Sequence, residues 1–328
     1  MADNAPELSR LTPLPDAERL RATVKKEFEE RYRQLLGDRY DDFIAHSLSY
    51  MNKSIRVNTL KTTVSEVRQR LERQAFSLYQ VPWCKEGFWV KGERTDLGNL
   101  IEHFLGYIYI QEAASMIPPE VLKPQPDEIV LDMCASPGSK TTQMAAMMQN
   151  TGLIVANDIN GSRMKPLGLN LQRLGVMNVA VTVMMGQQFR KRGIAFDKIL
   201  LDAPCSGTGT IRKSTETLKI WNAGMVKRLS NTQKSLIETA FTILKEGGEL
   251  VYSTCSNEPE ENEGVIDWML SRFPKASVEK ISLDIKSSEP VAEFEKKQYN
   301  IEIKKCLRIW PQDNNTEGFF VAKLSKNK

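Results

Sequence analysis

Short apolar runs alternate with amphipathic stretches through the last two thirds of the chain. Strand-like runs occupy residues 129–134, 153–158, 178–184, 196–203, 249–255 and 318–324. Helical patterns separate them at residues 139–149, 162–174, 230–244 and 259–273. Strands that are apolar throughout and alternate with helices are typical of a parallel sheet that is covered on both faces. We therefore predict an α/β fold for residues 111–328, with a doubly wound, mostly parallel sheet.

The first 110 residues follow different patterns. Residues 1–50 are predicted to form a polar N-terminal helical segment, because residues 17–36 carry apolar side chains at helical spacing. A strand pattern at 54–60, a helix with a capping-box start at 63–74 and a strand at 87–90 predict a small α+β domain over residues 51–110. The charged stretch 275–298 is interpreted as an insertion over one edge of the large sheet.

Composition excludes several classes of protein. The chain has 328 residues, 41% of them hydrophobic, which suffices for a globular core. No apolar run approaches the ~18 residues of a membrane span, and the opening MADNAPELSR has no leader pattern, so we predict a cytoplasmic protein without a membrane. Five separated cysteines and two histidines favour neither a disulfide framework nor a metal site.

Basic residues outnumber acidic residues modestly, 45 to 41, but they gather in clusters. One cluster on its own is more often a solvated surface than a binding site. Several clusters near the same motifs favour a polyanionic partner such as nucleic acid. The clusters lie at residues 61–73, 190–192, 212–213 and 227–228.

A predicted cofactor site follows the first strand of the large sheet. The stretch 134-CASPGSK-140 forms a Pro/Gly turn before a helix, where Gly138 permits close backbone approach and the helix N-terminus can hold an anionic group. Its spacing matches neither a Walker loop nor G-x-G-x-x-G. Asp158 ends the next strand, twenty residues after Gly138, and can bind the hydroxyls of a ribose. These features predict a nucleoside cofactor, and spacing alone leaves NAD and S-adenosylmethionine open.

Two cysteines are placed alike at the ends of strands. Cys205 and Cys255 each follow an apolar run, so a parallel sheet would bring both to the cofactor edge. The other three, Cys84, Cys306 and largely Cys134, are interpreted as small packed hydrophobes. A thiolate that adds to C6 of a cytosine turns C5 into a nucleophile for a methyl group. A carboxylic acid such as Asp202 can assist at N3, and a second thiol or its bound water can help to release the product.

Seven motifs then identify a family. The chain resembles the Nop/Sun family of RNA (cytosine-5)-methyltransferases over about residues 50–328. The paired D-A-P-C-S-G and S-T-C with E-E-N-E are the most specific of these motifs. In chain order the matches are 54-SIRVNTLK-61, 111-QEAASM-116, 131-LDMCASPGSKTTQ-143, 156-ANDI-159, 198-KILLDAPCSGTG-209, 251-VYSTCSNEPEENE-263 and 318-GFFVAKL-324.

The resemblance implies roles for individual residues. Cys255 would attack C6 and Cys205 would assist release, an order that chemistry alone leaves exchangeable. Asp202 would contact the target cytosine, with Lys140 nearby. The methyl donor S-adenosylmethionine would be bound by Cys134, Ala135, Ser136, Pro137, Gly138, Ser139, Lys140, Asp158, Arg163 and Asp202.

The resemblance also implies a Rossmann-like methyltransferase fold and an RRM-like N-terminal domain that helps to hold RNA. We expect a monomer that acts on structured RNA. The N-terminal motifs resemble bacterial members that modify small-subunit rRNA, whereas the compact length resembles archaeal members that modify tRNA. These two substrates stay balanced.

One departure from the family pattern affects the adenine site. The family usually has an aspartate where this chain reads 184-MMGQQF-189, and Met185 cannot accept a hydrogen bond from the adenine amino group. This substitution motivates an alternative, an RNA-binding assembly factor that has lost turnover. A nicotinamide-dependent dehydrogenase is disfavoured, because the glycine fingerprint is missing and the two thiols would have no task.

Overall fold

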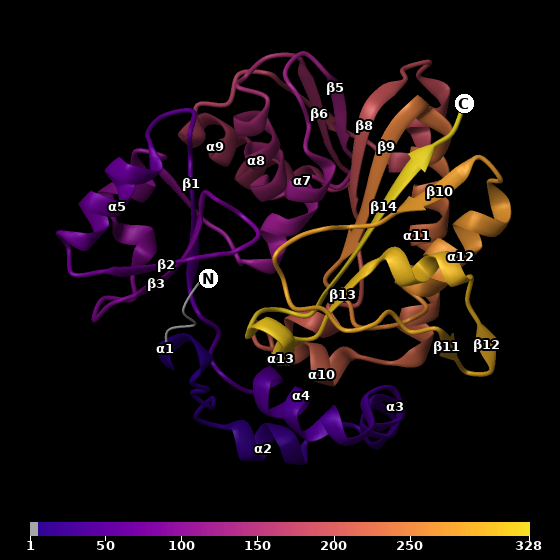
Figure 1. The fold of residues 1–328 in the computed structure, drawn as a ribbon, viewed down its shortest axis with the longest axis horizontal. Helices are drawn as coiled ribbons and strands as arrows, with labels where there is room; N and C mark the ends of the chain where they lie inside the picture. Colours follow the sequence, from indigo (N-terminus) through magenta and orange to yellow (C-terminus); the bar gives the residue numbers. More distant parts are fainter. Residues whose placement is uncertain (1–5) are drawn as a thin grey trace.

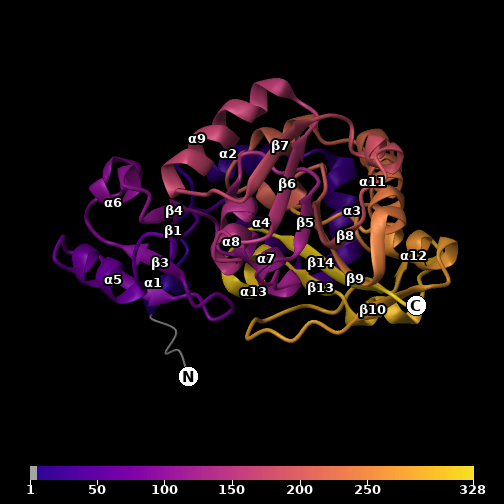
Figure 2. The same cartoon turned by 90° about the horizontal axis from the view of Figure 1, so that it is seen from above.

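Two β-sheets of different size organise the molecule. The computed structural model describes residues 6–328, and its helices and strands are shown in Figures 1 and 2. A small four-stranded sheet has the order β2-β3-β1-β4, and a large eight-stranded sheet has the order β10-β14-β9-β8-β5-β6-β7 with β13 paired to β14. A two-stranded ribbon, β11-β12, completes the strands of the described residues.

The small sheet is antiparallel throughout. The strand order and the chain order β1-α5-β2-β3-α6-β4 together give the β-α-β-β-α-β arrangement of an RRM. Helix α5 begins with the predicted capping box between Thr63 and Glu66 and packs Val67 and Leu71 on one face of the sheet. The elements are β1 (Ser54–Val57), α5 (Val64–Glu72), β2 (Ser77–Gln80), β3 (Gly87–Lys91), α6 (Ile101–Phe104) and β4 (Ile108–Ile110).

The opposite face of the small sheet packs against the large domain. Arg56 on β1 is buried and donates hydrogen bonds to the Ser139 carbonyl at 3.1 Å and to Thr142 Oγ1 at 2.9 Å. Its cross-strand partner Tyr109 lies under the guanidinium, 5.6 Å from ring centroid to Cζ. Both contacts reach the helix that follows the first strand of the large sheet, so the two sheets are joined through this face.

The N-terminal helices cover the lower part of the molecule in Figure 1. Their apolar side chains, such as Phe28 and Tyr32, pack with Trp221 and Trp310 of the large domain. The predicted helical run 17–36 is broken into two helices at residues 23–25. The elements are α1 (Pro6–Ser9), α2 (Ala17–Ala22), α3 (Lys26–Leu36) and α4 (Tyr40–Ser47).

The large sheet is parallel from β9 to β7 and antiparallel beyond β9. The predicted doubly wound, mostly parallel sheet is therefore confirmed. Its strands are β5 (Ile129–Asp132), β6 (Leu153–Asp158), β7 (Val179–Val183), β8 (Phe196–Asp202), β9 (Leu244–Thr254), β10 (Ala276–Glu279), β13 (Leu307–Ile309) and β14 (Phe319–Lys326).

Helices cover both faces of the large sheet, as Figure 2 shows. On the side that faces the small sheet, α7, α8 and α9 pack on residues such as Val130, Ile154 and Val251. On the other side, α11 and α12 pack on Leu131, Ile199 and neighbouring side chains. The helices are α7 (Ile117–Leu122), α8 (Ser139–Met147), α9 (Met164–Leu174), α10 (Glu216–Ile220), α11 (Ala223–Ile243), α12 (Glu263–Arg272) and α13 (Pro311–Asn314).

The charged stretch 275–298 is only partly an insertion. Residues Ala276–Glu279 form β10, the edge strand of the large sheet, so this part belongs to the sheet itself. The later part forms the ribbon of β11 (Glu293–Phe294) and β12 (Lys297–Gln298). Phe294 of this ribbon lies under the Arg31 guanidinium, which ties the ribbon to α3.

Candidate active site

The two conspicuous cysteines meet at the carboxyl ends of β8 and β9. These strands are parallel neighbours in register, with Asp202 opposite Ser253. Cys205 and Cys255 follow the two strand ends, and their sulfur atoms lie 3.2 Å apart. The contact with Cys255 and burial together raise the pKa of Cys205 well above its ordinary value. Cys205 therefore holds its proton as long as Cys255 is not bonded to a substrate.

One buried carboxylate braces both cysteine loops. Glu261 accepts hydrogen bonds from the Ser206 amide at 3.0 Å and from Ser256 Oγ at 3.1 Å, the residues that follow the two cysteines. Gln233 Nε2 of α11 donates to the same carboxylate at 2.7 Å. The E-E-N-E motif thus fixes the distance between the two sulfur atoms and is not part of the chemistry itself.

The pKa of Glu261 predicts a dependence of stability on pH. Burial is the largest influence and raises this pKa from 4.5 to about 7, against the hydrogen bonds that lower it. The folded state therefore binds the proton more tightly, and the stabilisation present below the unfolded pKa is lost as the pH rises through the folded value. In Glu261→Gln, the free energy of unfolding should fall less between about pH 5 and 8, by on the order of 1–3 kcal/mol.

Urea denaturation at several pH values checks this prediction. Glu302→Gln, a surface residue in an exposed ion pair with Lys305, is the matched control and should keep the wild-type slope. The prediction would be contradicted if the free energy of unfolding changed with pH to the same extent in the wild type and in Glu261→Gln.

Lys140 and Asp202 form an ion pair beside the thiols. Lys140 Nζ donates to Asp202 Oδ2 at 2.7 Å and to Ser115 Oγ at 3.1 Å. The other oxygen of Asp202 accepts from Ser253 Oγ at 2.7 Å. Burial is the largest single influence and lowers the pKa of Lys140, but the charge and hydrogen bond of Asp202, with the nearby Cys255 and Asp132, together outweigh it and the pKa is raised. Lys140 therefore carries the proton that this pair can offer to a substrate, and Asp202 positions it.

The loop from Cys134 to Lys140 bends around the ends of β5 and β6. Ser136 Oγ donates to the Arg163 carbonyl and the Arg163 guanidinium donates to the Ser136 carbonyl, both at 2.7 Å. Arg163 also lies 3.4 Å from Asp158 Oδ2, an oxygen that is buried and has no hydrogen-bond partner. A ribose hydroxyl would supply that partner, so the residues present fit a nucleoside cofactor. Gly138 has a φ of 99° and a Cβ there would lie 2.8 Å from Leu167, which explains glycine in this turn.

Apolar side chains flank the predicted adenine position. Ile159 and Met185 follow β6 and β7 and are exposed, at 65% and 49% of their surface. Neighbouring Asn157 is buried and donates its amide to the Met133 and Met184 carbonyls. Met185 therefore offers a packing surface, as the sequence indicated, and no hydrogen-bond acceptor from its side chain.

The structure adds residues that the sequence did not single out. Gly209 donates its amide to the Cys255 carbonyl, and its own carbonyl accepts from the Gly318 amide, each at 2.9 Å. Glu317 and Glu112 lie next to this contact. Gly209, Gly318 and Glu112 lie inside quoted motifs, at residues 198–209, 318–324 and 111–116, but nothing in those motifs indicated that they meet. Glu317 lies outside the quoted motifs.

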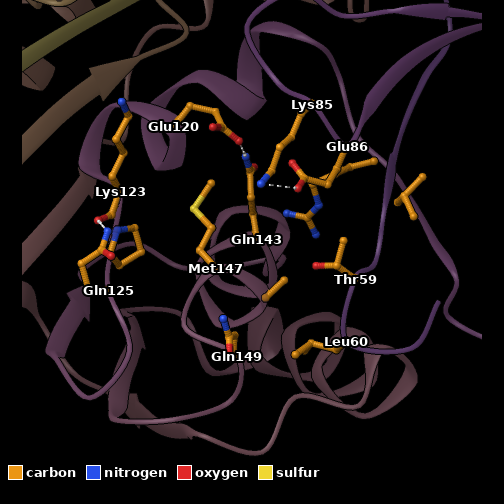
Figure 3. Close-up of a pocket in the computed structure, with 14 residues that line it drawn as sticks. Thr59, Leu60, Lys85, Glu86, Glu120, Lys123, Gln125, Gln143, Met147 and Gln149 are labelled. Atoms are coloured by element: carbon orange, nitrogen blue, oxygen red, sulfur yellow. Dashed lines mark hydrogen bonds and ion pairs between the residues drawn. The ribbon is translucent and has the colours of Figure 1, made fainter. Parts of the chain in front are cut away.

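A cavity lies away from the thiols. It has a volume of 820 Å³ and is bordered by the end of β1, by α7 and by α8, as Figure 3 shows. Beside it, Cys84, Glu86 and Glu120 offer one sulfur and two oxygens within 4.8 Å of one another. Burial raises the pKa of the Cys84 thiol, which disfavours the thiolate that a metal requires. Cys84 and Cys306 both pack in hydrophobic clusters, as predicted.

Comparison with known proteins identifies the family. A family model described as 16S rRNA methyltransferase RsmB/F matches residues 119–325. The chain belongs to this family. A second model, the N-terminal domain of 16S rRNA methyltransferase RsmF, matches residues 24–113. The resemblance to Nop/Sun proteins is confirmed, and the protein is a methyltransferase whose methyl donor is S-adenosylmethionine.

The chain is similar to relatives that are named for tRNA methylation and to relatives that are named for rRNA methylation. The tRNA (cytosine(49)-C(5))-methyltransferase of Pyrococcus abyssi is 47% identical over 304 residues, which cover 92% of this chain and 96% of that protein. Ribosomal RNA small subunit methyltransferase F of Shewanella piezotolerans is 45% identical over 297 residues, which cover 87% of this chain and 60% of that protein. The chain thus spans about 60% of the length of that rRNA relative.

Solved structures share the fold over almost the whole chain. A methyltransferase homolog protein from Pyrococcus horikoshii superposes with a TM-score of 0.85 at 40% identity and covers 95% of this chain and 99% of that one. The structure titled NSun6 from Pyrococcus horikoshii with SFG gives a TM-score of 0.82 at 25% identity, over 93% and 98% of the two chains. Among residues 6–328, no helix is long and apolar enough to cross a membrane.

Proposed function

We propose that this methyltransferase transfers a methyl group to C5 of a cytosine in RNA through a covalent adduct between Cys255 and C6. The observation that carries the proposal is the pair of sulfur atoms 3.2 Å apart beside the Lys140–Asp202 ion pair. S-adenosylmethionine supplies an electrophilic methyl group when it is bound. The named activity of the Pyrococcus abyssi relative, which matches at 96% of its length, supports tRNA as the first substrate to test.

The residues of the site divide the work as follows. The Cys255 sulfur adds to C6 while Lys140 donates a hydrogen bond to the ring atom that gains negative charge. Once C5 carries the methyl group, the Cys205 thiol gives its proton to water, and the resulting thiolate, or a water that it holds, removes the C5 proton. The electron pair of that C–H bond then restores the C5–C6 double bond and expels the Cys255 thiolate.

Cys205 loses its own proton more readily once the adduct forms, so that its thiolate becomes available as the base. The hydrogen bond to Cys255 is the largest cause of the raised pKa of Cys205. Alkylation of Cys255 by the cytosine removes the charge and the shared proton behind that effect, so the pKa of Cys205 falls at the stage when a base is needed. This sequence of events supports the order of roles that the family resemblance implied.

We further propose that residues 51–110 and the N-terminal helices help to hold the RNA, as separate units from the methyltransferase domain of residues 111–328. The centre of the small sheet is covered at Arg56, so the contacts must come from its edges, its loops and the basic face of α5. A cytosine in a helix is inaccessible, so the target must be unpaired or turned out.

Methylation of unmodified transcripts tests the proposal. With tritiated S-adenosylmethionine, we expect incorporation into a tRNA transcript, and bisulfite sequencing should then show one 5-methylcytosine. Small-subunit rRNA is the second substrate to test. Measurable S-adenosylmethionine binding by calorimetry without incorporation into either RNA would reject the proposal. The absence of binding at millimolar cofactor would instead favour the inactive assembly factor that Met185 suggests.

A further inference from the structure

A buried carboxyl group lies next to the nucleophile but has no part in the cycle described above. The link is Gly209, whose amide donates to the Cys255 carbonyl and whose carbonyl accepts from the Gly318 amide. A Cβ on Gly209 would lie 2.1 Å from the Gly318 carbonyl oxygen, so the two backbones are pressed together. Glu317 directly precedes Gly318 and is therefore held beside Cys255.

The carboxyl group of Glu317 has an unused acceptor. Only 5% of the residue is exposed, and its Oε1 is buried without a hydrogen-bond partner. The Glu317 amide donates to Glu112 Oε1 at 3.3 Å, and Glu112 Oε2 accepts from the Ser115 amide at 3.1 Å. Ser115 Oγ in turn accepts from Lys140. The backbone of Glu317 is thus linked through Glu112 and Ser115 to the Lys140–Asp202 pair, whereas its side-chain Oε1 has no partner.

Charges of both signs surround Glu317. Burial is the largest influence and raises the pKa of Glu317, while Lys213, Lys140 and Arg212 favour its ionised form and Asp202 opposes it. Burial and the charge of Glu317 raise the pKa of the neighbouring Glu112 to about 8. The two carboxyl groups disfavour each other's ionisation, and the basic residues around Glu317 favour a negative charge at that position.

Of the two carboxyl groups, that of Glu112 can be reached from outside. Glu112 and Lys213 line a pocket of 480 Å³, together with Lys53 and the exposed Ile110. Two basic residues and an apolar side chain at the mouth suit a nucleotide, whose phosphate and base need these two kinds of contact.

Cytosine and uracil differ at one position that a carboxylate can read. Cytosine carries an N4 amino group, which donates hydrogen bonds, whereas uracil carries a carbonyl oxygen, which a carboxylate repels. Resting on the proposed function, we propose that Glu317 accepts a hydrogen bond from the N4 amino group of the target cytosine and makes the site reject uracil. Glu112 holds Glu317 in place by accepting a hydrogen bond from the Glu317 backbone amide.

Binding without chemistry isolates this contact. In the Cys255→Ala background, the full-length protein is titrated with the RNA that the methylation assay identifies, carrying at the target position cytidine, uridine or the ribonucleoside of pyrimidin-2-one, which lacks the amino group. We expect cytidine RNA to bind roughly 10-fold tighter than the other two, as a hydrogen bond to a charged group requires. Adding Glu317→Leu, which removes the acceptor, should bring all three affinities within about twofold of each other.

The ratio of affinities in one preparation does not depend on the folded fraction, so partial unfolding of the variant cannot imitate the result. Glu30→Gln, which alters an exposed ion pair with Lys26, is the matched control and should keep the cytidine preference. A preference that survives Glu317→Leu would overturn the inference, as would equal binding of all three RNAs by the parent protein. Failure of the proposed function shows separately, as absent methyl transfer by the protein with Cys255 intact.

Discussion

Cys255→Ala is expected to lower methyl transfer by about 10⁴-fold or more, because loss of a covalent nucleophile removes the whole cycle. Cys205→Ala is expected to stop turnover as well, but by a different route. In that variant Cys255 can still add to C6, and the missing base leaves the RNA attached. Denaturing gels of protein mixed with labelled RNA and S-adenosylmethionine distinguish the two variants: only Cys205→Ala should retain the label.

The matched control is Cys306→Ala, a buried cysteine that packs in the core and takes no part in the chemistry. It should turn over and release RNA like the parent protein. Equal retention by the Cys205 and Cys255 variants would reject the order of roles, and retention by Cys255→Ala alone would exchange them.

Glu263→Ala is expected to lower the free energy of unfolding by about 3–5 kcal/mol, because it leaves the Arg308 charge buried and unpaired. Arg308 Nε and Nη2 donate to the two Glu263 oxygens at 2.7 and 2.5 Å, and both side chains are almost fully buried. Arg308 Nη1 also donates to the Asn257 carbonyl, two residues after Cys255. The loss of stability should therefore be accompanied by a loss of activity.

Guanidinium denaturation of the single and double variants separates the effects. The double variant Glu263→Leu with Arg308→Met removes both charges and should recover part of the lost stability. An exposed pair supplies the control: Glu302→Ala should cost about 1 kcal/mol or less. A loss for Glu263→Ala as small as the control would show that the buried pair is dispensable.

The long apolar strands and amphipathic helices were predictable because each follows one period over many residues. Strands β5, β6, β7 and β8 lie within two residues of the predicted ranges. The short strands β2, β4 and β13 were missed, since three or four residues are too few to show a period. The reversal of β14 was also hidden, because a fully buried strand has the same apolar pattern in either direction.

The candidate site also has one part that the sequence predicted and another that it did not. The meeting of Cys205 and Cys255 follows from parallel topology, so their strand-end positions in the sequence were sufficient. The bracing role of Glu261 and the position of Glu317 depend on how distant loops return to the sheet edge. No local pattern encodes such a return, and only the folded structure brings these carboxyl groups to the thiols.

The covered face of the small sheet limits how this enzyme can be re-engineered. Arg56 donates hydrogen bonds to Ser139 and Thr142 of α8. These contacts attach the RRM-like unit to the helix that follows the cofactor loop. A chimaera in which this unit is replaced by one from another RNA-modifying enzyme would disturb the S-adenosylmethionine site. To avoid this, the chimaera would have to keep the arginine and its two acceptors as a matched set. The RNA-holding role that we propose for the small domain is therefore easier to alter by changing its loops than by exchanging the whole domain.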